Sequence, residues 1–242
     1  MLIFLPALYI FLPSTKCVLL RTSVGINNID FTDFKITENN LNLGVAHNVN
    51  GCSIRCLENL QCLSFSYNWK TNACEMWDED FIHIYDTDGS TDVGWIYYYI
   101  IRDLECGITK ETCLSHSGFS YTPCFCHRYV STQMFYQNAF DNCASHNSSL
   151  ARVNRGFFQL TLENILAHVI DGEVRIQGNR ASITSTWRFD NGDLMKYFNW
   201  NTIDNQPSQT PTELSIVIRK SEGYRWHDAH IDYALSSVCH IY

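Results

Sequence analysis

Cysteine is the residue type that most constrains how this chain can fold. Eleven cysteines stand among its 242 residues, at positions 17, 52, 56, 62, 74, 106, 113, 124, 126, 143 and 239. If Cys17 leaves with a leader, ten remain, an even number that can form five disulfides in an oxidising compartment. A metal-cluster protein is the weaker alternative. Only the run Cys124-Phe125-Cys126-His127 resembles a ligand cluster, and it has no second pair at zinc-finger spacing.

Residues 1–17 are expected to be a secretory signal peptide. Leu2–Leu12 is almost wholly apolar, and a small polar break follows at Pro13-Ser14-Thr15. The segment is short for a bilayer span, and no other stretch stays apolar for about 18 residues. We therefore expect a secreted, extracellular protein without a membrane span.

The charge balance excludes one class of partner. The formal net charge is −8, and an acidic chain without a basic stripe is a poor nucleic-acid binder. No nucleophile–base spacing stands out, so we expect no enzyme and no catalytic residues. The sequon Asn147-Ser148-Ser149 predicts a glycosylated surface turn at Asn147.

The segment 18–105 reads as a small α+β module. A helix is expected over Asn50–Leu60, where Cys52 and Cys56 are four residues apart and share one face. Strands are expected at Leu63–Tyr67 and at Gly94–Ile101, which is rich in aromatic and β-branched residues. Bridges Cys52–Cys74 and Cys56–Cys62 would hold the helix to these strands, and this pairing is one of three possible for four cysteines.

These residues resemble a PAN/apple-like module. The residues that carry the resemblance are Cys52, Cys56, Cys62, Phe65, Tyr67 and Cys74. The resemblance implies a module that binds proteins or carbohydrates and is not an enzyme. The family's outer bridge is not evident once Cys17 is removed. Tyr97, Tyr98 and Tyr99 can be read as a sticky surface or as core, and the core reading is favoured.

The segment 106–242 is expected to be a second domain with two helices, short strands and a long loop. Cys113 and Cys124 flank a predicted hairpin at Gly118–Tyr121 and are expected to be bridged, while the pairing among these two, Cys106 and Cys126 stays open. Helices are predicted at Thr132–Ser145, with an apolar stripe from Phe135 to Cys143, and at Phe157–Val169. Strands are predicted at Glu173–Gly178, Trp187–Phe189, Leu214–Ile218 and Val238–Ile241, with a tight turn at Asn191-Gly192.

In this segment the chain resembles the C-type lectin-like domain. The matching residues, in order, are Ala139, Cys143, Leu150–Val153, Val174–Gly178, Trp187–Gly192, Trp200, Gln206–Ser208, Glu213, Trp226–Asp228 and Cys239. The resemblance implies an α+β C-type lectin-like fold and a bridge between Cys143 and Cys239. Two departures stand out: the family's second bridge falls on Ser215 and Ile231, and Arg175 replaces a tryptophan. A missing bridge in a small secreted domain removes roughly 2–5 kcal/mol.

The resemblance also places a candidate binding site. The carbohydrate-binding residues would be Gln206, Ser208, Glu213, His227 and Asp228, and the same set without His227 would bind calcium. Oxygen ligands of this kind suit calcium, and a glutamine before the proline goes with galactose in this family. Ser208 replaces an aspartate and His227 an asparagine, which weakens the charge of the site. Two alternatives stay open: a polar turn beside a core tryptophan, or a softer metal held by His227 and His230.

The leading hypothesis is a secreted lectin-like recognition protein. It would bind glycans, in a galactose-type and calcium-assisted manner, and the resemblance associates such proteins with microbial recognition. Other extracellular proteins are candidate partners of the PAN-like module. The alternative is a protein-binding adhesion or matrix component whose lectin-like domain is degenerate and metal-free. A third reading is a toxin-like effector on the same fold.

Overall fold

The computed structural model describes residues 2–4, 23–102 and 107–242, and the chain divides into two compact units, Met1–Cys106 and Gly107–Tyr242. Most of the predicted leader, with Cys17, lies outside the described residues, and so does Cys106. Within the described part, residues Leu2–Phe4 form strand β1, which pairs antiparallel with β2. No helix in the described ranges is both long and apolar enough to cross a membrane.

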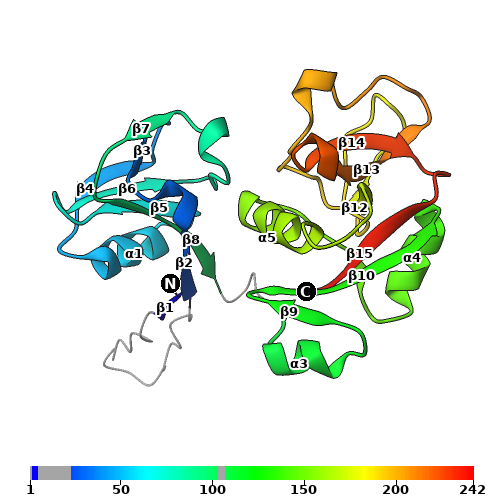
Figure 1. Ribbon diagram of the computed structural model, residues 1–242, viewed down its shortest axis with the longest axis horizontal. Helices are drawn as coiled ribbons and strands as arrows, with labels where there is room; N and C mark the ends of the chain where they lie inside the picture. The colour runs from blue at the N-terminus through cyan, green and yellow to red at the C-terminus, as the bar shows by residue number, and fades with distance from the viewer. Residues whose placement is uncertain (1, 5–22, 103–106) are drawn as a thin grey trace, which may run out of the picture. The chain divides into compact units, whose positions relative to one another are not determined.

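The first unit is built on a six-stranded sheet in the order β1-β2-β8-β5-β6-β4 (Figure 1). Its strands after β1 are β2 (Ser23–Asn28), β4 (Asn42–Val45), β5 (Ser64–Asn68), β6 (Ala73–Trp77) and β8 (Trp95–Arg102). A two-stranded sheet pairs β3 (Phe34–Ile36) with β7 (Gly89–Thr91). Short 3-10 turns occupy Ile29–Phe31 (η1) and Ile84–Asp86 (η2).

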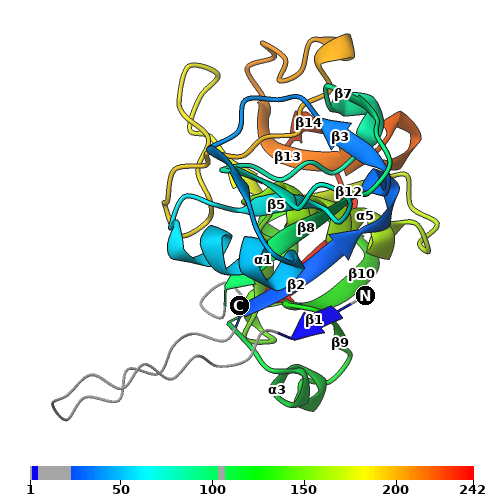
Figure 2. The same cartoon turned by 90° about the vertical axis from the view of Figure 1, so that its left-hand side faces the viewer.

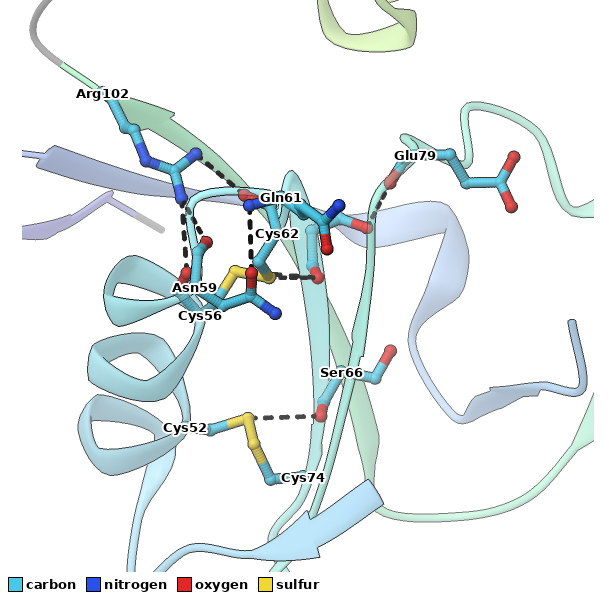
Figure 3. Close-up of a disulfide and its surroundings, with 10 residues drawn as sticks. Cys52, Cys56, Asn59, Gln61, Cys62, Ser66, Cys74, Glu79 and Arg102 are labelled. Atoms are coloured by element: carbon cyan, nitrogen blue, oxygen red, sulfur yellow. Dashed lines mark hydrogen bonds between the residues drawn. A yellow bond between two sulfur atoms is a disulfide. The ribbon is translucent and has the colours of Figure 1, made fainter. Parts of the chain in front are cut away.

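Helix α1 (Val49–Glu58) packs against one face of this sheet (Figure 2). It begins where the Asn48 side chain accepts a hydrogen bond of 2.9 Å from the Gly51 amide, which satisfies one of the free donors at a helix start. Cys52 and Cys56 are fully buried on its inner face. Bridges Cys52–Cys74 and Cys56–Cys62 join the helix to β6 and to the turn before β5 (Figure 3).

Aromatic side chains from β8 form much of this core. Tyr97, Tyr98 and Tyr99 are almost completely buried. Tyr98 stacks on Phe65, with ring centroids 5.1 Å apart, whereas Tyr97 and Tyr99 meet edge to face. Such buried aromatic contacts stabilise a sheet beyond the area they bury. The three tyrosines are therefore core residues and not an exposed surface.

The second unit has a seven-stranded sheet, with the path β14-β13-β12-β15-β10-β9 and β11 paired to β15 (Figure 1). Its strands are β9 (Ser120–Thr122), β10 (Phe125–Met134), β11 (Ser149–Leu150), β12 (Glu173–Asn179), β13 (Glu213–Arg219), β14 (Arg225–His230) and β15 (Leu235–Ile241). Its helices are α3 (Lys110–Ser115), α4 (Tyr136–Ala144) and α5 (Gly156–Leu166), with 3-10 turns at Thr202–Asp204 (η3) and Lys220–Glu222 (η4).

Bridges bind the first helices of this unit to its strands. Cys143 on α4 is bonded to Cys239 on β15, and Cys113 on α3 is bonded to Cys126 on β10. Cys124 is also disulfide-bonded. Cys126, and not Cys124, is thus the partner of Cys113. This choice follows from the hairpin, since the turn between β9 and β10 falls at Pro123-Cys124 and not at Gly118–Tyr121.

Two predicted elements differ from the structure. The helix expected from Thr132 begins only at Tyr136, because β15 extends the ladder of β10 as far as Met134. Phe135 consequently precedes the helix and is half-exposed instead of heading an apolar stripe. Trp187–Phe189 is not a strand: Arg188 makes only isolated bridges, to Asn179 and Leu194.

Gly178 is required where β12 turns towards the long loop. Its φ of 137° is strained for any L side chain, and an added Cβ would lie 2.4 Å from Ile216 Cδ1. The absence of a side chain lets β12 pack closely on β13. The chain then continues through Asn179 to Arg180, whose backbone N–H donates to the Leu214 carbonyl at 3.1 Å. Arg180 is thereby held beside the end of β13.

Candidate functional site

The residues of the predicted site are divided between two faces, because successive side chains of β14 point in opposite directions. In the pairing with β13, His227 lies opposite Val217 and Asp228 lies opposite Ile216. Successive side chains of a strand point to opposite faces of the sheet. His227 and Asp228 therefore have different partners, and the five predicted residues do not form one site.

Ser208, Glu213 and Asp228 come together. The Ser208 amide donates to Asp228 Oδ1 at 2.8 Å, and the Ser208 hydroxyl lies 3.4 Å from Asp228 Oδ2. The same hydroxyl donates a short hydrogen bond to Glu213 Oε2. The Gln206-Pro207 peptide bond just before Ser208 is cis. We call Arg180, Ser208, Glu213 and Asp228 the Asp228 cluster.

The cation of this cluster comes from the chain itself. Arg180 Nη2 lies 2.6 Å from Asp228 Oδ2, and both side chains are almost fully buried, with 3% and 0% of their surface exposed. The guanidinium also donates to the carbonyls of Ser208 and Glu213, at 3.1 and 3.0 Å, and lies over the ring of Trp187. A planar guanidinium held by a carboxylate and carbonyls has the geometry of a permanent ion pair.

The electrostatics of the cluster follow from this burial. Desolvation raises the pKa of the Asp228 carboxyl above its ordinary value, and the Ser208 amide and the charge of Arg180 offset part of that rise. A buried ion pair is costly to break because removing one partner leaves the other charge uncompensated. The positive charge of Arg180 thus lowers by one the net negative charge that the sequence predicts for the Asp228 cluster.

In the part of the chain that the structure describes, the Gln206 side-chain oxygen has no hydrogen bond to the Asp228 cluster. Its backbone N–H donates to the Asn201 carbonyl at 3.0 Å. Its Oε1 atom is buried and finds no hydrogen-bond partner among the residues the structure describes. Buried carboxamide oxygens are normally paired, so this atom is an unsatisfied acceptor, which a ligand reaches only if the Gln206 side chain turns outward.

His227 belongs to a second cluster with Asp204 and Glu222. Their nearest ligand atoms lie within 4.8 Å of one another. His227 Nε2 makes a short contact with Glu222 Oε2, and Asn201 Nδ2 donates to Asp204 Oδ2 at 3.0 Å. Although burial acts the other way, the hydrogen bond from Asn201 and the contact with His227 hold the pKa of Glu222 below its usual value. We call these three residues with Asn201 the His227 cluster.

His230, the other histidine considered from sequence, lies outside the His227 cluster. Its Nδ1 atom is 3.6 Å from Asp232 Oδ2, and its ring stacks on Tyr233. Trp226 anchors strand β14, which carries His227, Asp228 and His230. It is fully buried, and its indole N–H donates to Gln159 Oε1 at 2.8 Å. The tryptophan is a core residue.

Arg180, Asn201 and Glu222 were missed by reasoning from the sequence. Arg180 follows a predicted strand by two residues, but no pattern signals that its side chain turns back to Asp228. Asn201 and Glu222 are separated by 21 positions and meet only because the loop runs beside β14, where the backbone of Asn201 donates to the Trp226 carbonyl. The predicted glycosylation residue Asn147 is exposed in a turn after α4, with φ of 52°.

A comparison with known families identifies the first unit. The family model of the PAN domain matches residues 27–99. The first unit is a PAN domain. This match agrees with the two bridges that hold α1 of the PAN domain to its sheet.

The helices α4 and α5, the Cys143–Cys239 bridge and a long loop containing a cis proline agree with the C-type lectin-like fold that the sequence of the second unit resembles. Solved structures similar to part of the chain include human lithostathine, at 19% identity and a TM-score of 0.47 over 52% of this chain and 88% of that one. The C-type lectin CEL-I from Cucumaria echinata matches at 19% identity and a TM-score of 0.47, over 51% of this chain and 94% of that one. A calcium-independent type II antifreeze protein matches at 19% identity and a TM-score of 0.46, over 52% of this chain and 92% of that one. No curated protein sequence matches the chain.

Proposed function

We propose that the protein is an extracellular recognition protein whose lectin-like unit binds a hydroxyl-rich ligand, a glycan, without a resident calcium ion in the Asp228 cluster. The disulfides of both units support an oxidising, extracellular location. The role is binding and not catalysis. Asp228, the most buried carboxylate of the cluster, is engaged by Arg180 and by the Ser208 amide and is unavailable as a base.

The observation that carries the proposal is the 2.6 Å contact between Arg180 and Asp228. A calcium ion needs six to eight oxygen ligands. Here the carboxylate of Asp228 and the carbonyls of Ser208 and Glu213 are already bonded to a guanidinium, which has no acceptor to offer a metal. Calcium would have to displace a buried arginine, and both charges would then need new partners.

The ligand-binding groups in this proposal are the polar side chains that take no part in the Arg180–Asp228 ion pair. Gln206 Oε1 is an acceptor without a partner among the described residues, and the outer edge of Glu213 is partly exposed. A sugar hydroxyl donates directly to the partly exposed Glu213 carboxylate, and to the Gln206 oxygen once that side chain turns outward. In the alternative function, which the free Gln206 oxygen also favours, calcium mediates galactose binding through Gln206, Ser208, Glu213 and Asp228.

The calcium dependence of glycan binding decides between the metal-free proposal and the calcium-mediated alternative. The full-length protein is applied to a glycan array in calcium and in a calcium-free, chelator-treated buffer. We expect the same glycans to be bound in both conditions. Binding that disappears without calcium would contradict the metal-free proposal, and absence of glycan binding in both conditions would favour the protein-binding adhesion role.

A pair of variants tests the part played by Arg180. Ser208→Asp restores the carboxylate that the family carries, and by charge alone should create calcium affinity. We expect calorimetry to detect no calcium binding by Ser208→Asp, because Arg180 pairs with the added charge, and measurable binding by the double variant Ser208→Asp, Arg180→Gln. The matched control is Arg188→Gln, which removes an exposed guanidinium that donates to the Gly192 carbonyl. Calcium binding by Ser208→Asp alone would overturn the role given to Arg180.

The PAN domain supports a second set of partners. Its surface exposes large apolar side chains, among them Ile29, Leu43, Leu60, Trp69 and Tyr85. Such side chains mark a protein-binding surface where they form one contiguous patch, and scattered singly they are normal on a protein surface. Binding of another extracellular protein through this unit is compatible with glycan binding by the second unit.

A further inference from the structure

The His227 cluster combines a buried imidazole with two carboxylates at an accessible edge of the second unit. The exposed fraction of the His227 side chain is 1%, that of Glu222 is 27%, and Asp204 is exposed. One nitrogen and two carboxylate oxygens thus converge with a side open to solvent. Zinc sites that keep an exchangeable position for water are built from three protein ligands, among them imidazole nitrogens and carboxylate oxygens.

The Asn201 side chain marks the centre of the cluster. Its Nδ2 atom lies 3.0 Å from Asp204 Oδ2 and 3.3 Å from His227 Nε2, and it makes a short hydrogen bond to Glu222 Oε2. An amide NH₂ has two hydrogens for these three neighbours. The three candidate ligand atoms are therefore arranged around one point that a positively polarised group already occupies.

The state of the His227 ring is an independent observation. Its Nδ1 atom is buried without a partner among the described residues, so the hydrogen bonds of the ring all involve Nε2. The ring is fixed in β14 by burial, and the edge that carries Nε2 faces Glu222 and Asn201. A buried imidazole aimed into a group of carboxylates is the arrangement expected of a metal ligand.

The local charge also leaves room for a cation. Asp204 and Glu222 are both acidic. The nearby cation, Arg219, is shared: its Nε lies 2.7 Å from Glu173 Oε1, and its Nη1 lies 3.3 Å from Glu222 Oε1. Arg219 therefore neutralises only part of the charge of the cluster.

We propose that His227 Nε2, Glu222 and Asp204 bind a borderline divalent metal ion of the zinc class. An imidazole ligand favours such a metal over calcium. On binding, the Asn201 amide rotates to present Oδ1 to the ion, since its NH₂ group cannot act as a ligand. The site is separate from the Asp228 cluster, because the partners of His227 and of Asp228 among the described residues differ.

The test uses the full-length protein, free of any histidine tag, and Zn²⁺ as the probe. Calorimetry should show one Zn²⁺ per chain and no comparable binding of Ca²⁺. Glu222→Gln and Asp204→Asn keep the shape of each side chain while removing its charge. Each should weaken Zn²⁺ binding by an amount at least equal to the roughly 10–100-fold measured for outer partners of metal ligands.

Two further variants keep the result unambiguous. Asn201→Asp adds a carboxylate at the centre and should tighten Zn²⁺ binding, an effect that partial unfolding cannot imitate. His230→Gln removes a histidine on the same strand that lies near Asp232 and outside the cluster, and it should bind Zn²⁺ as the wild type does. Co²⁺ in place of Zn²⁺ should give a visible absorption band that is lost in Glu222→Gln.

Three results would overturn the proposal. They are the absence of Zn²⁺ binding by the wild type, an unchanged affinity in both Glu222→Gln and Asp204→Asn, and loss of Zn²⁺ binding in His230→Gln. None of these bears on the glycan-array result, so the failure of this site and the failure of the glycan proposal are distinguishable.

Discussion

At the scale of single residues, Arg175 makes contacts where the resemblance to the C-type lectin-like domain implies a second bridge that this chain lacks. Arg175 Nη1 donates to the Ser215 hydroxyl at 2.5 Å, and Nη2 donates to the Tyr233 carbonyl at 2.9 Å. Ser215 stands where the sequence resemblance places the missing cysteine. The arginine that replaces the tryptophan therefore links β12 to β13 and to the turn after β14. Burial lowers the pKa of Arg175 to about 10, which leaves it charged at neutral pH.

Removing this link should destabilise the second unit. Arg175→Ala leaves a cavity and takes the donors from Ser215 and from the Tyr233 carbonyl, and we expect the free energy of unfolding to fall by about 2–4 kcal/mol. Urea denaturation of the full chain measures this. Arg188→Ala, which removes an exposed arginine, should change the stability by no more than about 0.5 kcal/mol. Equal effects of the two substitutions would contradict the role of Arg175.

His240 is a second residue whose burial has a measurable consequence. Its ring stacks on Phe125 with centroids 4.1 Å apart. Burial lowers the pKa of His240 to about 3, with the charges of His127 and Arg152 acting in the same direction. Between about pH 6.5 and pH 3 the unfolded chain therefore binds a proton at this residue that the folded protein does not.

The free energy of unfolding should consequently fall as the pH is lowered through that window. His240→Leu removes the titrating group, and its stability should depend less on pH, by an amount on the order of a few kcal/mol across the window. Denaturant titrations at several pH values give the slope. His168→Leu, at an exposed position, is the control and should keep the wild-type slope. An unchanged slope in His240→Leu would show that other groups control the acid sensitivity.

At the scale of elements, Arg102 joins the end of β8 to the end of α1 (Figure 3). Its Nη1 donates to the Cys62 carbonyl at 2.8 Å, and its Nη2 donates to the carbonyls of Cys56 and Asn59 at 3.3 and 3.0 Å. The last carbonyls of a helix lack intrahelical donors. One buried guanidinium satisfies the Cys56 carbonyl of α1 and the Asn59 and Cys62 carbonyls of the following turn, so helix and sheet are stabilised together.

Substitution of Arg102 should therefore loosen the PAN domain. Arg102→Ala leaves several buried carbonyls without donors, at a cost of roughly 2–4 kcal/mol in unfolding free energy. The measurement is the thermal unfolding of the full chain, followed in the transition of the first unit. Arg55→Ala lies on the exposed side of the same helix and should have a much smaller effect. If the two variants melt alike, the carbonyl contacts contribute little.

At the scale of the whole molecule, the chain consists of two units with separate cores. Contacts divide it between Cys106 and Gly107, one residue from the boundary expected from the sequence. The described bridges each lie within one unit. Each unit thus has the means to fold by itself.

We predict that the fragment 106–242 folds alone. It has an even set of six cysteines and its own apolar core. Expressed under oxidising conditions, it should show one cooperative thermal transition by circular dichroism, and alkylation under native conditions should detect no free thiol. A fragment without a cooperative transition would show that the PAN domain is needed for its stability.

The sequence by itself determined the elements whose patterns are local. Spacing of four placed Cys52 and Cys56 on one helix face, alternation marked β5 and β13, and the Asn191-Gly192 pair marked a turn. The ends of elements were less accessible: β10 continues to Met134 because a partner from the far end of the chain supplies its hydrogen bonds. Local propensity contains no information about such a partner.

Only the tertiary structure decided the chemistry of the site. Gln206, Ser208, Glu213, His227 and Asp228 were selected as one set because they fall where the C-type lectin-like family carries its sugar-site residues, but strand alternation separates His227 from Asp228. Arg180, 48 positions before Asp228, supplies the cation, and Asn201 and Glu222 complete the other cluster. The physical reason is that a charge acts through space over a few ångströms. Distance along the chain does not determine which charges will meet.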